Sequence, residues 1–112
     1  MTDDRTGDQL LKMLTALANP HRLRILAALH ERQAYVSELA RELEMSRPLL
    51  HMHLQTLEKV GLVVGRHEVS AEGKALRYFE VADFDEQLSP ERITEAVKTL
   101  SRHDEPDGKA KR

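Results

Sequence analysis

The chain contains no cysteine and no tryptophan, and it has only two phenylalanines and two tyrosines among its 112 residues. The lack of cysteine excludes disulfides, thiol redox sensing and thiolate metal sites. With so few aromatic side chains, Leu, Val, Ile and Ala must supply most of the core. No apolar run approaches the roughly 20 residues needed to cross a bilayer. The acidic N-terminus also lacks the basic and apolar regions of a signal peptide. We therefore expect a cytoplasmic protein without membrane insertion.

The length of the chain leaves room for one domain. Its composition, 40% apolar and 32% charged, is ordinary for a globular protein. We expect residues 8–103 to form this domain. Residues 1–7 and 104–112 are expected to be disordered ends, because the tail has no apolar residues able to form a packed structure.

The charge distribution gives little indication of a partner. The net charge is −2, and residues 20–80 hold nine basic and eight acidic side chains. A basic stripe, which would indicate nucleic acid, is therefore absent. Any affinity for DNA has to come from the placement of a few Arg and Lys side chains.

Capping residues and apolar spacing predict two helices in the first third of the chain. Leu10, Leu14 and Leu17 recur at helical spacing, and Leu11 and Met13 fall on other sides of the same helix. Asn19-Pro20 is typical of a helix start and predicts a second helix over about 20–31. The residues expected inside this second helix are Leu23, Leu26 and Ala27, with Ile25 or Leu29, and those expected to be exposed are His21, Arg22 and Arg24.

The segment 36–64 has the pattern of a helix-turn-helix followed by a strand. After a short extended piece at 34–35, Ser37 is the expected cap of a third helix, about 38–44. Ser46 is the expected cap of a fourth, with Pro48 in its first turn and Gly61 at its end. Residues 62–64 and 75–81 flank a Gly-containing turn at 70–73, which predicts a β-hairpin. Ser89-Pro90 begins a last helix with an apolar stripe, Ile93, Val97 and Leu100.

A helical wheel assigns the faces of the fourth helix. Leu50, Leu54 and Leu57 form the core side, and His53 borders it. Arg47 is at the helix start, and the residues expected to face outward along the helix are Pro48, His51, Met52, Gln55 and Lys59. A recognition helix places such residues against base edges in the major groove. Arg can bind guanine, Gln can bind adenine, and Pro or Met can contact a thymine methyl group.

The hairpin carries basic residues that predict contacts with DNA phosphates, as in a wing. They are Arg66, His67, Lys74 and Arg77. The helix caps Ser37 and Ser46 complete the predicted DNA-contacting set. In the alternative, Glu68, Glu72 and Glu80 neutralise the wing in surface ion pairs, each worth at most about 1 kcal/mol.

Two stretches, LTALANPHRLRILAAL at 14–29 and VSELARELEMSRPLLHMHLQTLEKVGLV at 36–63, together with the hairpin ending RYFEV, carry a family resemblance. The chain resembles the ArsR family of bacterial winged-helix transcriptional repressors over about residues 8–100. The resemblance implies a mainly α fold with a β-hairpin wing (α+β). It also implies a homodimer, joined through the first and last helices, that binds a near-palindromic operator. The predicted interface residues are Leu10, Leu11, Met13, Leu14, Ile93, Val97 and Leu100.

The sequence departs from metal-sensing members of that family. Many carry a Cys-x-Cys pair at the start of the third helix, where this chain has Tyr35 and Ser37. Others bind zinc on the last helix, but Glu91, Glu95, His103 and Asp104 lack the required spacing. His51 and His53 point in different directions on one helix. We therefore expect no metal and no cofactor. An effector, whether a small molecule or a protein, has no signature in the sequence.

Two other functions remain open on the sequence alone. A winged helix can serve as a protein-interaction module in a transcription or signalling complex, and the near-neutral middle and acidic end favour that use. Such a module predicts no salt-dependent DNA binding. An enzyme is not expected, because the sequence has no nucleophile–base pair, phosphate-binding Gly-rich loop or metal cluster.

Overall fold

The computed structural model describes residues 5–102 of the chain. Of the ends predicted to be disordered, residues 1–4 and 104–112 lie outside this range, and residues 5–7 lie inside it, where Gly7 begins the first helix. The described residues form two compact units, one of residues 13–84 and one of residues 5–12 with 85–102. Helix α1 (Gly7–Leu17) contributes its first turns to the smaller unit and its last turns to the larger one.

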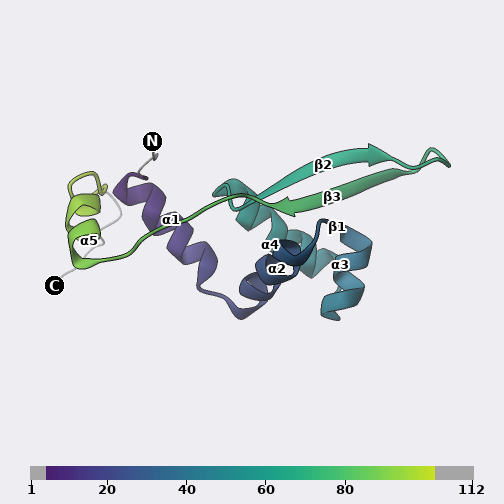
Figure 1. Cartoon of the computed structure of the whole chain (residues 1–112), viewed down its shortest axis with the longest axis horizontal. Helices are drawn as coiled ribbons and strands as arrows, with labels where there is room; N and C mark the ends of the chain where they lie inside the picture. Colours follow the sequence, from purple (N-terminus) through teal and green to yellow (C-terminus); the bar gives the residue numbers. More distant parts are fainter. Residues whose placement is uncertain (1–4, 103–112) are drawn as a thin grey trace. The chain divides into compact units, whose positions relative to one another are not determined.

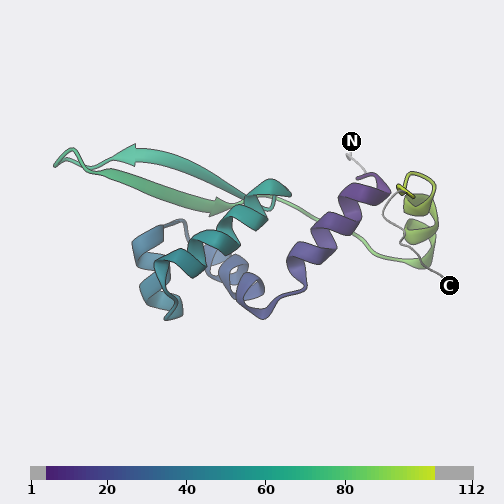
Figure 2. The same cartoon turned by 180° about the vertical axis from the view of Figure 1, so that it is seen from behind.

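The larger unit is a winged helix-turn-helix (Figure 1). After the end of α1 come α2 (Pro20–Glu31), β1 (Ala34–Tyr35), α3 (Val36–Leu43) and α4 (Arg47–Lys59). Strands β2 (Val63–Val69) and β3 (Ala75–Val81) then form an antiparallel hairpin. Figures 1 and 2 both show this hairpin extending past the helices of its unit. The predicted fold class is therefore confirmed.

The predicted hairpin has a third strand. β1 pairs with β3 so that the sheet order is β1-β3-β2, with Ala34 opposite Phe79 and Tyr35 opposite Tyr78. An isolated two-stranded hairpin is marginally stable in water. The extra pairing, together with the buried side chain of Phe79, fixes the base of the wing to the helices.

Side-chain caps start three of the helices where the sequence predicts them. The Asn19 side chain accepts hydrogen bonds from the N–H groups of His21 and Arg22 at 2.9 and 3.2 Å. Ser46 Oγ accepts from Leu49 N–H at 3.2 Å, and Ser89 Oγ starts α5 (Pro90–Val97) in the same way. Each cap satisfies N–H groups that have no partner within the helix.

The predicted cap at Ser37 is wrong. Pairing of β1 with β3 brings the chain into α3 two residues earlier, so Tyr35 is the capping residue and Ser37 lies inside the first turn. The side chain of Glu38 accepts the backbone N–H of Tyr35 at 3.1 Å. A hydrogen bond from the backbone N–H of Tyr35 to a glutamate in the first turn therefore replaces the expected serine cap.

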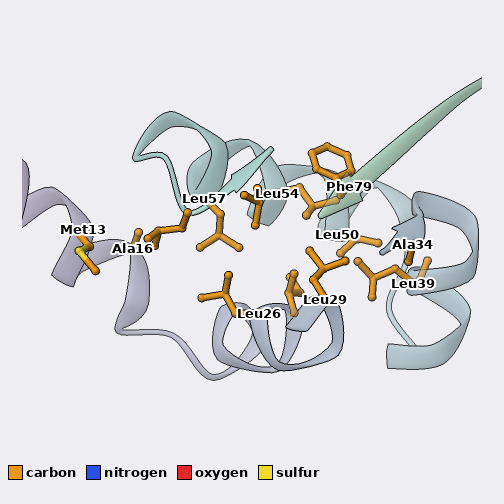
Figure 3. Packing of buried hydrophobic residues seen from close by; sticks show 14 residues of the cluster. Met13, Ala16, Leu26, Leu29, Ala34, Leu39, Leu50, Leu54, Leu57 and Phe79 are labelled. Atoms are coloured by element: carbon orange, nitrogen blue, oxygen red, sulfur yellow. The ribbon is translucent and has the colours of Figure 1, made fainter. Parts of the chain in front are cut away.

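The core of the larger unit lies between α2, α3, α4 and the base of the sheet (Figure 3). Leu50, Leu54 and Leu57 of α4 have 0% exposure, as predicted, and each contributes about 1.5–3 kcal/mol by its burial. On α2 the prediction is partly wrong. Leu26 is buried together with both Ile25 and Leu29, whereas Leu23 is 53% exposed and Ala27 is also exposed. Arg22, expected in solvent, is half-buried.

The smaller unit brings the start of α1 against α5 (Pro90–Val97). The N–H of Gly7 donates to Thr99 Oγ1 at 2.7 Å, and the N–H of Ser101 donates to the Asp8 carboxylate at 2.8 Å. Glu86 accepts from Arg5 at 2.8 Å and from Arg92 at 3.1 Å. This polar network ties the N-terminal turns of α1 to the segments that flank α5.

Candidate nucleic-acid interface

The turn between α3 and α4 is fixed by backbone geometry. Glu44 has a φ of 53°, in the left-handed region, and ends α3. The N–H of Met45 donates to the Ala40 carbonyl at 2.9 Å. These bonds satisfy carbonyls at the end of α3 and set the angle at which α4 begins.

Helix α4 presents two opposite faces. The face described above is buried in the core, and the residues predicted to face outward are exposed or, for His51, half-buried. Those exposed are Arg47, Pro48, Met52, Gln55 and Lys59. The assignment of faces is therefore confirmed, while their contacts with DNA stay a prediction. Ser46 is exposed, but its hydroxyl is already engaged in the cap.

His53 connects the inner side of α4 to α2. Its side chain is buried, and its Nδ1 lies 3.1 Å from Arg22 Nη1. The same guanidinium donates from Nε to the carbonyl of Ala16 at 2.7 Å. Burial, with the nearby charge of Arg22, lowers the pKa of His53 below 6.5. His53 is therefore packed, as the sequence predicts, and uncharged at neutral pH.

One face of the wing, the outer face, carries Arg66, Glu68, Tyr78 and Glu80. These residues form an aromatic and ionic cluster. Arg66 lies 4.9 Å above the ring centre of Tyr78 and bonds Glu80 at 2.9 Å. The ring of Tyr35 lies 4.7 Å from that of Tyr78, and its hydroxyl donates to Glu68 at 3.0 Å. That hydrogen bond raises the pKa of Tyr35 above 10.0. The charge of Arg66 is thus largely neutralised, as the ion-pair alternative expects.

The opposite face of the wing, the inner face, and the turn of the wing carry the other predicted basic residues. His67 and Arg77 lie opposite each other on β2 and β3, and Lys74 lies in the turn. Arg77 is half-buried: its guanidinium lies 4.9 Å from the ring centre of Phe79 and 3.7 Å from Glu58 of α4. His67 and Lys74 are exposed, and neither forms an ion pair with the described residues. Among the predicted basic residues of this face and the turn, Arg77 is therefore paired with a carboxylate, whereas His67 and Lys74 are not.

The sequence does not predict the contacts that three residues make with side chains of neighbouring elements. These residues are Arg22, Glu58 and Gly65. The first two are ordinary charged residues on helices, and nothing in the pattern distinguishes them. Gly65 has a signal, because a glycine inside a strand often marks a close approach of another group. Its role depends on cross-strand neighbours that only the register reveals.

The position of the family's cysteine pair holds no metal-binding group in this chain. The Tyr35 hydroxyl is bonded to Glu68, and Ser37 is half-buried within α3. Within residues 5–102, no three His, Asp or Glu side chains are grouped so that they could hold a metal ion. His103 and Asp104 lie outside the described residues. None of the described helices is long and apolar enough to cross a membrane.

Comparison with known proteins identifies the family. Residues 19–64 match the model of the bacterial regulatory proteins of the arsR family. An uncharacterized HTH-type transcriptional regulator from Methanocaldococcus jannaschii is 38% identical over 85 residues, which cover 75% of this chain and 87% of that protein. The chain belongs to the ArsR family.

Further relatives match over similar lengths. The transcriptional activator HlyU of Vibrio cholerae is 34% identical over 76% of this chain and 79% of its own length. The crystal structure of fragment 1-100 of a possible transcriptional regulatory protein from Mycobacterium bovis is also similar, with 32% sequence identity. It has a TM-score of 0.61 and covers 68% of this chain and 76% of that one. Its solution structure is described as a homodimeric winged helix-turn-helix DNA-binding domain.

Proposed function

We propose that this ArsR-family chain is a transcriptional repressor that binds a near-palindromic operator as a homodimer. The observation that carries the proposal is the division of α4 into a fully buried leucine face and an exposed face, with Arg47 at the start of the helix and Gln55 further along it. A recognition helix needs this division, because one side must hold it to the domain while the other enters the major groove.

Contacts to bases come from the exposed face of α4. Arg47 donates two hydrogen bonds to a guanine, and Gln55 pairs with an adenine. His51 donates to a base or a phosphate, and Pro48 or Met52 contacts a thymine methyl group. These five residues determine which operator is bound, and Ser37 and the cap Ser46 lie near the phosphates of the same groove.

Phosphate contacts come from the inner face and turn of the wing. Lys74 and His67 are free to bind phosphates, whereas Arg66 and Arg77 are engaged with carboxylates of the chain itself. Lys74 therefore supplies the main electrostatic contribution of the wing, and His67 adds a hydrogen bond. Arg66 and Arg77 act chiefly by fixing its position.

The dimer is held by the apolar surface of the smaller unit. Val97 is 56% exposed, and Leu11, Ile93 and Leu100 are also exposed. Exposed leucines and valines in a cluster favour a partner surface. Leu10 and Met13 are buried within the chain and Leu14 is partly buried, so the more exposed four carry most of the interface. Residues 8–103 act as one DNA-binding and dimerisation domain, working in the cytoplasm and without catalytic activity.

Footprinting on the DNA upstream of the chain's own gene tests this proposal. We expect protection of two half-sites about one helical turn apart. The logarithm of the binding constant should fall linearly with the logarithm of the salt concentration. The absence of protection at low salt contradicts DNA binding and favours the protein-interaction module. A reporter gene behind the protected site then gives the sign of regulation, because lower expression with the protein present is required for a repressor.

A further inference from the structure

A single guanidinium joins the end of α1 to the recognition helix. Arg22, in the first turn of α2, donates from Nε to the Ala16 carbonyl at 2.7 Å, and its Nη1 lies 3.1 Å from His53 Nδ1. All three residues belong to the larger unit. Ala16 is close to the end of α1, where carbonyls lack partners within the helix. Arg22 therefore holds two helices through two bonds made by one rigid group.

The chemistry of this contact fixes the protonation state of His53. A guanidinium has only N–H donors, so His53 Nδ1 must accept, and the proton of the neutral ring is on Nε2. His53 Nε2 is buried and has no hydrogen-bond partner. A protonated ring would place an N–H at Nδ1 against the N–H of Arg22 and two positive charges side by side. The contact exists only while His53 is neutral.

The surroundings of His53 offer its charged form no compensation. The charged or titratable groups that face it are Arg22 and His21, both from α2, and the His21 ring centre is 5.5 Å away. The end of α1 presents only the Ala16 carbonyl, which Arg22 already occupies, and no carboxylate of the described residues pairs with His53. A leucine would fill the position without leaving a buried N–H unpaired, so packing alone does not require a histidine here.

We propose that the Arg22–His53 contact holds the recognition helix α4 in its binding position, and that protonation of His53 breaks this contact and weakens DNA binding in acid. The inference rests on the proposed DNA-binding function. Arg22 and His53 are positioning residues, because they act through α4 from its buried side. The chain then responds to the proton concentration without a metal or a small-molecule ligand.

Three substitutions separate the parts of this proposal. His53→Asn keeps an acceptor near the place of Nδ1 and cannot be protonated. Arg22→Met keeps the length of the side chain but removes both bonds. His30→Asn is the matched control, since it removes an exposed histidine of α2 that lies outside the proposed DNA contacts.

The first measurement is the affinity of the full chain for a duplex from its own upstream region, between about pH 5 and pH 8. On acidification we expect the wild type to lose about tenfold more affinity than His53→Asn loses. His30→Asn retains the wild-type loss. Arg22→Met binds about tenfold more weakly already at the alkaline end. Equal pH profiles for wild type and His53→Asn overturn the proposal, as does wild-type affinity of Arg22→Met.

The second measurement needs no variant. Nuclear magnetic resonance of the isotope-labelled full chain follows the Arg22 Nε–H and the His53 ring nitrogens during a pH titration. We expect the Arg22 signal to be protected from exchange at the alkaline end and to change at the same midpoint as His53. Separate midpoints overturn the proposed contact. Wild-type protein that shows the shared midpoint but binds neither its upstream duplex nor a random duplex contradicts the DNA-binding function and, with it, the effect of pH on binding.

Discussion

Arg77 and Gly65 approach each other so closely across the wing that no side chain fits between them. A Cβ at position 65 would lie 2.8 Å from Arg77 Nη2 and 2.7 Å from Cε1 of Phe79. The backbone of β2 at this glycine thus leaves room for Arg77 to lie against the Phe79 ring. Arg77 Nη2 is also 3.7 Å from Oε1 of Glu58 in α4. The wing and the recognition helix are joined at this point.

Gly65→Ala should therefore reduce the free energy of unfolding by about 1–3 kcal/mol, because the added methyl group overpacks the base of the wing. Urea denaturation of the full chain measures this loss. In an Arg77→Ala background the loss should become smaller, since one of the two obstructing groups is gone and the substitutions are coupled. An alanine that leaves the stability unchanged means that Arg77 and Phe79 move aside without cost.

The sequence predicts the local features of this fold well. Asn19, Ser46 and Ser89 are caps in the structure, because a cap depends only on the residues that follow it within one turn. The buried face of α4 is also predictable, since its leucines repeat at helical spacing. The start of α3 is not, because it depends on the pairing of Tyr35 with Tyr78, which is distant in the sequence.

Tertiary neighbours decide what the sequence leaves open. Helix α2 has apolar residues around much of its circumference, so periodicity cannot choose between Ile25, which is buried, and Leu23, which is exposed. The same holds for the wing arginines. Arg66 and Arg77 look equivalent as sequence, but the register puts them on opposite faces with different carboxylate partners.

Arg47→Ala should weaken binding to the operator by about 1–3 kcal/mol and leave binding to a random duplex nearly unchanged. The reason is that a base contact adds discrimination, whereas a phosphate contact adds affinity for any sequence. Electrophoretic mobility shifts with both duplexes measure the two affinities. Arg24→Ala, an exposed arginine outside the predicted interface, is the control. Equal losses on the two duplexes identify Arg47 as a phosphate contact.

Lys74→Ala should reduce the slope of log affinity against log salt by about one. Lys74 is exposed in the turn of the wing without an ion pair among residues 5–102, so a phosphate is free to bind it. Arg66→Ala should change the slope less, because Arg66 is already paired with Glu80 at 2.9 Å. Fluorescence anisotropy at several salt concentrations gives both slopes. A larger effect from Arg66 than from Lys74 contradicts the assignment of Lys74 as the unpaired cation and Arg66 as the paired one.

Val97→Glu should convert the dimer into a monomer and reduce operator affinity by at least about tenfold, because each half-site is then bound without its partner. A carboxylate at this exposed apolar position would have to be desolvated in the interface. Sedimentation equilibrium measures the oligomeric state. Thr94→Glu introduces the same charge at an exposed polar position of α5 and serves as the control. A dimer that survives Val97→Glu places the interface elsewhere.

Acidification should destabilise the folded chain through His53. Burial lowers the pKa of His53 in the folded state below its value of 6.5 in the unfolded chain. Between these two values the unfolded state binds more protons, so the free energy of unfolding falls as the pH decreases through that window. Above 6.5 the contribution of His53 is constant, since the ring is neutral in both states.

Urea denaturation of wild type, His53→Asn and the control His51→Asn across this pH range isolates the effect. The difference in stability between wild type and His53→Asn should shift in favour of the variant as the pH falls below 6.5, because asparagine binds no proton in either state. His51→Asn should follow the wild type, since His51 is only half-buried and lies on the other face of α4. If the wild-type and His53→Asn curves stay parallel, the buried ring does not resist protonation, and the tie between Arg22 and α4 is insensitive to pH.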